Sequence, residues 1–251
     1  MRCPICKVEL LPYFGIFLTC PECGSKFREG KEWSKDEYIK DYFEDRKQRF
    51  PWLSELTSDY QHYQVFLISI GDVPFKRKWN IIHSLGGGFP KLESILKPNK
   101  IIVYDICAEE YMLLPSYIWD FFKQKYQPPQ IIYKDKIEDI EVGEDDLITA
   151  CHFFEHLEME NIIRLLKSLR GYLLIYQPNP ETFYSPNWFF AHEDHISLLS
   201  PLAWERIFKE FGWDILYFTR YSEDQCFFVF KGTKTPNRTK HSASSLFNSI
   251  I

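Results

Sequence analysis

Four cysteines in two pairs lie at the start of the chain: Cys3 with Cys6, and Cys20 with Cys23. Each pair has the spacing Cys-x-x-Cys, which allows two thiolates to turn toward one ion. Together they supply the four soft ligands that tetrahedral zinc prefers, and residues 7–19 between the pairs suit a short hairpin. Because four thiolates fill the coordination shell, the pattern predicts structural Zn²⁺ rather than a catalytic ion.

Disulfide bonds and thiol redox chemistry are the alternative explanations for these cysteines. The sequence runs from Met1 directly into the first pair without a secretory signal, which favours a reducing, cytoplasmic location over disulfides. A second matching pair also argues against redox chemistry at a single Cys-x-x-Cys. The other cysteines lie in apolar stretches and are predicted to be buried thiols: Cys107, Cys151 and Cys226.

A second group combines three consecutive glycines, Gly86 to Gly88, with a later acid, Asp105. The glycines follow a predicted strand over 80–85, and Asp105 lies near the end of the next predicted strand, 100–106. Glycine lets a ligand approach the backbone closely, and the helix expected after the turn offers its first N–H groups to an anion. A carboxylate at the neighbouring strand end suits the two hydroxyls of a ribose. The combination predicts a nucleoside-binding site.

Predicted strands alternate with predicted helices from Trp79 onward. Such alternation is typical of an α/β fold, in which helices cover both faces of a parallel sheet. The remaining strands are expected at 130–133, 146–151 and 172–177, the helices at 89–96, 111–125, within 152–169 and at 201–211, and a closing antiparallel hairpin at 214–219 and 225–230.

The chain divides into four predicted parts. Within the second part, Ser34 and Glu37 have the spacing of a capping box at the start of a helix over 34–48. The last part is basic and serine-rich, and we expect it to be disordered. The parts are a metal module at 1–30, a helical linker or cap at 31–78, the α/β domain at 79–231 and the tail at 232–251.

The net charge of the chain indicates which kinds of binding partner to expect. The formal net charge is −5 and the sequence pI is about 5.8, which weighs against broad affinity for nucleic acid. Basic residues in and after the metal module, with the run Lys76-Arg77-Lys78, leave a local RNA contact open. The longest apolar run, around Val65 to Ile70, is far too short to span a membrane.

Five segments, in their order and spacing, carry a family resemblance: residues 81–90, Val103-Tyr104-Asp105, 146–157 with Glu155-His156-Leu157, 170–179 with Pro178-Asn179, and 192–201. They resemble the motifs of class I S-adenosylmethionine-dependent methyltransferases, over roughly Trp79 to Phe230. The resemblance implies a Rossmann-like sheet of seven strands with the last strand antiparallel. Residues 1–30 would add a small N-terminal zinc ribbon.

The resemblance also implies residue roles around S-adenosylmethionine. Gly86 and Gly88 would face its methionine and ribose, and Asp105 would bind the ribose hydroxyls. Asp135 would meet the adenine amino group. The sequence departs from the family's first motif at two positions, because Ser84 replaces an acid and Pro90 replaces the final glycine. The implied cofactor-binding set is Ser84, Gly86, Gly88, Asp105, Asp135 and Cys151.

Two histidines are candidates for catalysis or acceptor binding. His152 follows Cys151 at the end of the fourth predicted strand, where it would line the pocket near the reacting methyl group; a core histidine is the alternative. His195 lies in a loop with His192 and Glu193-Asp194, for which we favour an acceptor contact, with a second metal site as the alternative. His156 is expected to be structural.

The predicted function is S-adenosylmethionine-dependent methyl transfer to a small molecule, a sugar or an RNA base, with the zinc ribbon aiding acceptor recognition. A catalytically lapsed binding or scaffold protein is the alternative, because the first motif lacks its acid. A dinucleotide-dependent oxidoreductase is a lesser alternative, against which the Glu-His-Leu and Pro-Asn segments argue. The sequence indicates no protein partner.

Overall fold

The computed structural model describes residues 1–30, 32–40, 56, 77–183, 194–222 and 225–232. It groups the chain into two compact units, Trp33–Ala150 and a second unit that joins Met1–Glu32 to the chain from Cys151 onward. The predicted tail after Gly232, the last residue of β11, and most of the predicted linker lie outside the described residues. Within the described part, no helix has the length and apolar character needed to cross a membrane.

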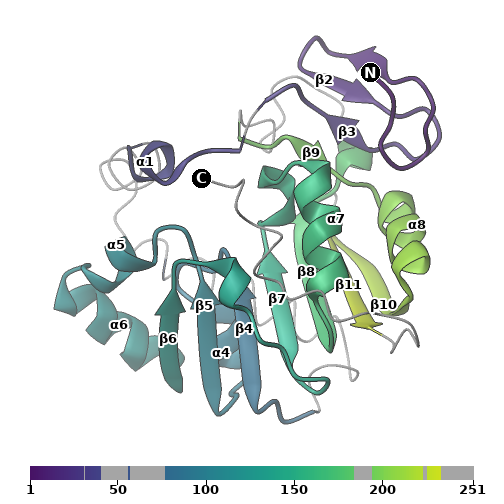
Figure 1. Cartoon of the computed structure of the whole chain (residues 1–251). Coiled ribbons are helices and arrows are strands. Elements are labelled where there is room, and N and C mark those ends of the chain that lie inside the picture. Colours follow the sequence, from purple (N-terminus) through teal and green to yellow (C-terminus); the bar gives the residue numbers. More distant parts are fainter. Residues whose placement is uncertain (31, 41–55, 57–76, 184–193, 223–224, 233–251) are drawn as a thin grey trace. The chain divides into compact units, whose positions relative to one another are not determined.

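The unit Trp33–Ala150 contains a parallel sheet with the order β7-β4-β5-β6 (Figure 1). The register pairs the strand ends, so that Leu85 lies opposite Tyr104 and Tyr104 lies opposite Lys134. The carboxyl ends of these strands therefore meet at one edge of the sheet. The strands are β4 (Ile81–Leu85), β5 (Lys100–Tyr104), β6 (Gln130–Lys134) and β7 (Leu147–Cys151).

Three short helices connect these strands: α4 (Lys91–Ile95), α5 (Ala108–Met112) and α6 (Ser116–Tyr126). The helical region predicted at roughly 111–125 contains two helices, α5 and α6, because Pro115 interrupts it in an extended conformation with ψ 140°. The predicted capping box is confirmed at α1 (Lys35–Tyr38), where Ser34 and Glu37 satisfy each other's backbone N–H groups.

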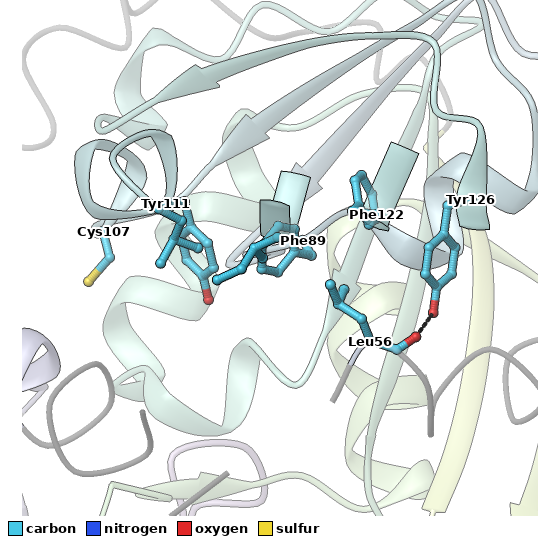
Figure 2. Packing of buried hydrophobic residues seen from close by; sticks show 8 residues of the cluster. Leu56, Phe89, Cys107, Tyr111, Phe122 and Tyr126 are labelled. Carbon is cyan, nitrogen blue, oxygen red and sulfur yellow. Dashed lines mark hydrogen bonds between the residues drawn. The ribbon is translucent and has the colours of Figure 1, made fainter. Parts of the chain in front are cut away.

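Aromatic side chains build much of the core of this unit (Figure 2). Phe89, directly after the glycine turn, is buried with its ring 5.5 Å from that of Tyr111 and 5.3 Å from that of Phe122. The Tyr126 hydroxyl donates a hydrogen bond of 2.9 Å to the Leu56 carbonyl. Burying one such side chain stabilises the fold by roughly 1.5–3 kcal/mol. The core therefore anchors the residue that ends the glycine turn.

In the second unit, the strands β8 (Tyr172–Pro178), β11 (Gln225–Gly232) and β10 (Trp213–Ser222) pair in the order β10-β11-β8. Both pairings are antiparallel. The helices α7 (Met159–Ser168) and α8 (Pro201–Phe211) belong to the same unit.

The seven expected strands are all described, and the last of them, β11, is antiparallel as expected. Five strands form the central parallel sheet, and β10 and β11 form an antiparallel hairpin beside β8. Only residues 223 and 224 separate β10 from β11, and a connection of two residues can join neighbouring strands only in antiparallel fashion.

A small antiparallel sheet gathers the N-terminal residues of the second unit, in the order β1-β2-β3-β9 (Figure 1). Its last strand comes from far along the chain, because Lys26 pairs with Leu198 and Phe27 with Ser197. Phe17 and Leu198 are buried together with Phe183 in its core. The strands are β1 (Leu11–Tyr13), β2 (Phe17–Thr19), β3 (Lys26–Phe27) and β9 (Ser197–Leu198).

Candidate cofactor site and metal-ligand clusters

The glycine turn after β4 has a backbone that favours glycine. Gly86 has a φ of 59° and Gly88 a φ of 46°, both in the left-handed region. The Gly86 N–H donates to the Tyr104 carbonyl at 2.8 Å, and the Tyr133 hydroxyl donates to the Gly88 carbonyl at 2.7 Å. The turn is thus tied to the end of β5, which neighbours β4, and to the end of β6, which lies beside β5.

The carboxylate of Asp105 lies against this turn, as the sequence predicts. Its Oδ2 accepts a hydrogen bond of 3.0 Å from the Gly88 N–H, and its Oδ1 accepts one of 2.8 Å from the Cys107 N–H. Burial raises the pKa of Asp105, while the two amide donors act in the opposite direction. An ionised carboxylate has about four acceptor positions. Two therefore remain for a ligand such as a ribose diol.

Gly88 also has a packing role that the sequence does not reveal. A Cβ at this position would lie 2.4 Å from the Tyr111 hydroxyl. Tyr111 belongs to α5 and is buried in the aromatic core of this unit. Its ring therefore has little room to move. The glycine is required by a neighbouring side chain as well as by its backbone angle.

Gly88→Ala should therefore destabilise the protein more than a glycine substitution that strains the backbone alone. Gly15→Ala is the matched control, because Gly15 has a φ of 67° and open space around its missing Cβ. A left-handed alanine costs roughly 1–2 kcal/mol, and overpacking adds about 1–3 kcal/mol at Gly88 only. Denaturant unfolding of both variants measures the difference; equal losses would contradict the contact with Tyr111.

A buried acid lies beneath the turn although the first motif lacks one. Glu93 of α4 is 3% exposed, and its Oε1 accepts hydrogen bonds from the Ser84 hydroxyl at 2.8 Å and from the Thr149 hydroxyl. Burial raises the pKa of Glu93. Ser84 therefore holds a carboxyl group from the next helix close to the position where the family has its own acid. The cofactor contact expected of Ser84 stays a prediction, as does that of the exposed Asp135.

The four N-terminal cysteines come together as the spacing predicts. Their Sγ atoms all lie within 4.8 Å of one another. The Cys6 N–H donates to Cys3 Sγ at 3.3 Å and the Cys23 N–H to Cys20 Sγ at 3.5 Å. Arg206 of α8 donates to Cys6 Sγ at 2.6 Å, which offsets part of the negative charge of a thiolate cluster. The donor set fits a tetrahedral metal ion.

A lysine is buried beside this cluster in β3. Lys26 is 5% exposed, and its ammonium donates to the Pro180 carbonyl and lies 4.7 Å from the centre of the Tyr13 ring. Burial lowers the pKa of Lys26 from 10.5 to about 8. Folding therefore disfavours its charged form.

This lysine should make stability depend on pH. Between pH 8 and 10.5 the unfolded chain binds the Lys26 proton more readily than the folded protein, so the free energy of unfolding should rise with pH. The slope contributed by one group is at most about 1.4 kcal/mol per pH unit. Lys26→Met should remove this rise, whereas the exposed Lys209→Met should keep it. Denaturant unfolding across this range tests the difference, and an unchanged slope in Lys26→Met would contradict it.

A second cluster of titratable side chains surrounds the short helix η3 (Phe154–His156). Glu155 is 1% exposed and accepts a hydrogen bond from His152 Nδ1 at 2.9 Å. His156 Nδ1 lies 3.2 Å from the Asp194 carboxylate, and the His156 and His195 rings are 4.8 Å apart. His152 has a φ of 51°, an uncommon conformation that recurs at functional sites. His152 and His195 are thus brought into one cluster, which their sequence spacing alone does not predict.

Charge couples these groups. Burial opposes ionisation of Glu155, but the hydrogen bond from His152 and the nearby imidazoles lower its pKa overall. Burial also opposes protonation of His156, yet its hydrogen bond to Asp194 raises its pKa overall. Asp194 in turn has its pKa lowered to about 2 against the effect of burial, mainly by His156. The cluster therefore contains two carboxylates held ionised by imidazoles.

A groove of about 460 Å³ runs beside the cysteine module in the same unit. Arg2 and Arg28 line it from the module, and Glu158 and Ile196 line it from later segments. Ile196 directly follows His195, and its N–H donates to the Glu155 carbonyl at 2.8 Å. The module thus contributes Arg2 and Arg28 to a groove that also contains the residue after His195.

No family model matches the chain, and no curated protein matches it by sequence. Several solved structures share its fold. The mitomycin 7-O-methyltransferase MmcR is 14% identical with a TM-score of 0.56, over 80% of this chain and 61% of that one. The riboflavin-derivative dimethyltransferase RosA from Streptomyces davawensis is 12% identical with a TM-score of 0.54, over 80% and 62%. This chain spans about three fifths of those two proteins.

A third similar structure is an S-adenosylmethionine-dependent methyltransferase from Clostridium acetobutylicum. It is 12% identical with a TM-score of 0.51, and the match covers 76% of this chain and 99% of that one. Such identities establish the fold alone. The described part of the chain therefore has the α/β fold of S-adenosylmethionine-dependent methyltransferases, with a parallel central sheet.

Proposed function

We propose that this protein transfers a methyl group from S-adenosylmethionine to a small-molecule acceptor. The observation that carries the proposal is the contact of 3.0 Å between Asp105 Oδ2 and the Gly88 N–H. It joins a carboxylate at the end of β5 to a glycine turn at the end of β4. A nucleoside needs this combination for its ribose hydroxyls and for close approach of the backbone.

The residues present fit the cofactor. Asp105 would accept the ribose hydroxyls through the acceptor positions that Gly88 and Cys107 leave open. Tyr133 and the Gly86 N–H hold the turn in place for this contact. The cofactor, when bound, supplies an activated methyl group on a sulfonium. The chain's own task is to align the acceptor and to exclude water.

We further propose that the cysteine module, residues 1–30, is a zinc ribbon that binds one structural Zn²⁺ through Cys3, Cys6, Cys20 and Cys23. The groove beside the module supports a role in acceptor recognition. Two structures of the same fold bear the names of enzymes that methylate small molecules, mitomycin and a riboflavin derivative. Together with the net charge of −5, this favours a small molecule over RNA.

A non-catalytic binding protein is the second candidate. It is favoured by the packing of Tyr111 on Gly88, because both the turn and Asp105 are engaged by the protein's own groups. An assay of methyl transfer distinguishes the two candidates, because only the enzyme would transfer a methyl group to an acceptor.

Incubation of the full-length, zinc-loaded protein with methyl-labelled S-adenosylmethionine tests the proposal. One arm contains a small-molecule extract and the other total RNA. We expect label to appear in the small-molecule fraction. Label in RNA would assign the other acceptor class, and the absence of label in both arms, despite cofactor binding, would favour the non-catalytic protein.

A further inference from the structure

The side chains of Glu155, His156 and His195 form a ligand set separate from the cysteines. Each offers an oxygen or nitrogen ligand atom, and these atoms all lie within 4.8 Å of one another. Ligands at about 2.0–2.2 Å from a common ion lie at most about 4.4 Å apart. Small side-chain rotations are therefore sufficient to bring the three onto one ion.

A second observation concerns the carboxylate of Glu155. Its Oε2 is buried and has no hydrogen-bond partner among the residues that the structure describes. Its other oxygen accepts from His152 Nδ1, so the carboxylate is held in one orientation. A buried carboxylate oxygen without a donor is costly, and a cation beside two imidazoles would satisfy it.

His156 is oriented as metal-binding histidines usually are. Its Nδ1 contacts Asp194, with 3.2 Å to the carboxylate and 3.3 Å to the carbonyl. A histidine that donates from Nδ1 to a carboxylate carries its lone pair on Nε2, which is the arrangement that fixes the tautomer of a ligand. Asp194 would therefore orient the ligand His156 through a hydrogen bond without binding the ion itself.

The third ligand, His195, is held in position by strand pairing with the cysteine module. His195 lies two residues before β9, which pairs with β3 of the module. The Arg28 N–H also donates to the Ile196 carbonyl at 3.0 Å. Because the neighbouring backbone is bonded to both the module and η3, His195 is fixed against Glu155 and His156.

We propose that Glu155, His156 and His195 bind a divalent first-row transition-metal cation. Two imidazoles and one carboxylate suit this class of ion, and a site with three protein ligands keeps coordination positions open. An oxygen atom of the acceptor can take such a position, and a metal lowers the pKa of a bound hydroxyl. Only this last role depends on the proposed methyl transfer.

Mn²⁺ is the probe that separates the two metal-binding clusters, because thiolates bind it poorly and nitrogen and carboxylate ligands accept it. The full-length protein, prepared with one zinc per chain, is titrated with Mn²⁺, and unbound Mn²⁺ is measured by electron paramagnetic resonance. We expect saturable binding of one further ion. Glu155→Gln and His195→Ala should each weaken it by more than about 100-fold, and Asp194→Asn by about 10- to 100-fold.

Glu160→Gln is the matched control, because Glu160 is exposed on α7 nearby, and it should bind Mn²⁺ like the wild type. Circular dichroism and zinc content identify variants that fold normally, and Glu155→Asp should recover part of the affinity if the carboxylate is a ligand. No Mn²⁺ binding by the wild type, or equal binding by folded Glu155→Gln and His195→Ala, would overturn the proposal. Neither result depends on S-adenosylmethionine, so the methyl-transfer proposal is tested separately.

Discussion

Cys20→Ser combined with Cys23→Ser should remove zinc from the protein and unfold the cysteine module. Structural zinc contributes on the order of 10 kcal/mol to the folding of small zinc domains. A module of this size has few buried side chains to replace that contribution, with Phe17 and Phe27 among them. We expect the metal content to fall from one zinc per chain to none.

The loss should spread along the hydrogen bonds that leave the module. The Ser200 N–H donates to Ser25 Oγ at 3.0 Å, and β3 pairs with β9. Hydrogen exchange should therefore accelerate in residues 1–30 and 194–200, while β4 to β6 in the other unit keep their protection. Cys107→Ser, which changes a buried cysteine outside the cluster, should retain zinc. Zinc retained by the double variant, or unchanged exchange in its module, would show that the cysteines are not the metal ligands.

Asp105→Ala should weaken binding of the cofactor by at least about 100-fold. Two hydroxyl hydrogen bonds to a charged carboxylate would be lost, each worth about 1.5–3 kcal/mol. The variant also leaves the N–H groups of Gly88 and Cys107 without this acceptor, which loosens the turn itself. Equilibrium dialysis with labelled S-adenosylmethionine measures the affinity directly.

Asp120→Ala controls for the loss of a negative charge, because Asp120 is exposed on α6 of the same unit. It should bind the cofactor like the wild type. Circular dichroism of Asp105→Ala checks that the fold remains. If folded Asp105→Ala bound within threefold of the wild type, the adenosyl group would have to lie elsewhere in the protein.

Features that depend on neighbouring residues in the sequence could be predicted well. The capping box at Ser34, the glycine turn and the two Cys-x-x-Cys pairs are all local patterns. The contact between Gly88 and Asp105 is longer in range, yet it follows from the rule that parallel strands place their carboxyl ends together. The break between α5 and α6 is a local feature as well, because it falls at Pro115.

Other features depend on packing that no short pattern encodes. Glu93 brings a carboxyl group to Ser84 from a different element, and only its buried position reveals this contact. Tyr111 reaches Gly88 across the core. The pairing of β3 with β9 involves two residues on each side, too few for any periodicity, and joins segments far apart in the chain. The grouping of His195 with Glu155 follows from that pairing.

Calorimetric titration of the full-length, zinc-loaded protein with S-adenosylhomocysteine tests whether the glycine turn binds an adenosyl group. We expect a saturable heat with one ligand per chain, which Asp105→Ala abolishes and Asp120→Ala retains. No detectable heat at about 1 mM ligand, corresponding to a binding free energy weaker than about −4 kcal/mol, would contradict an adenosyl site at the glycine turn.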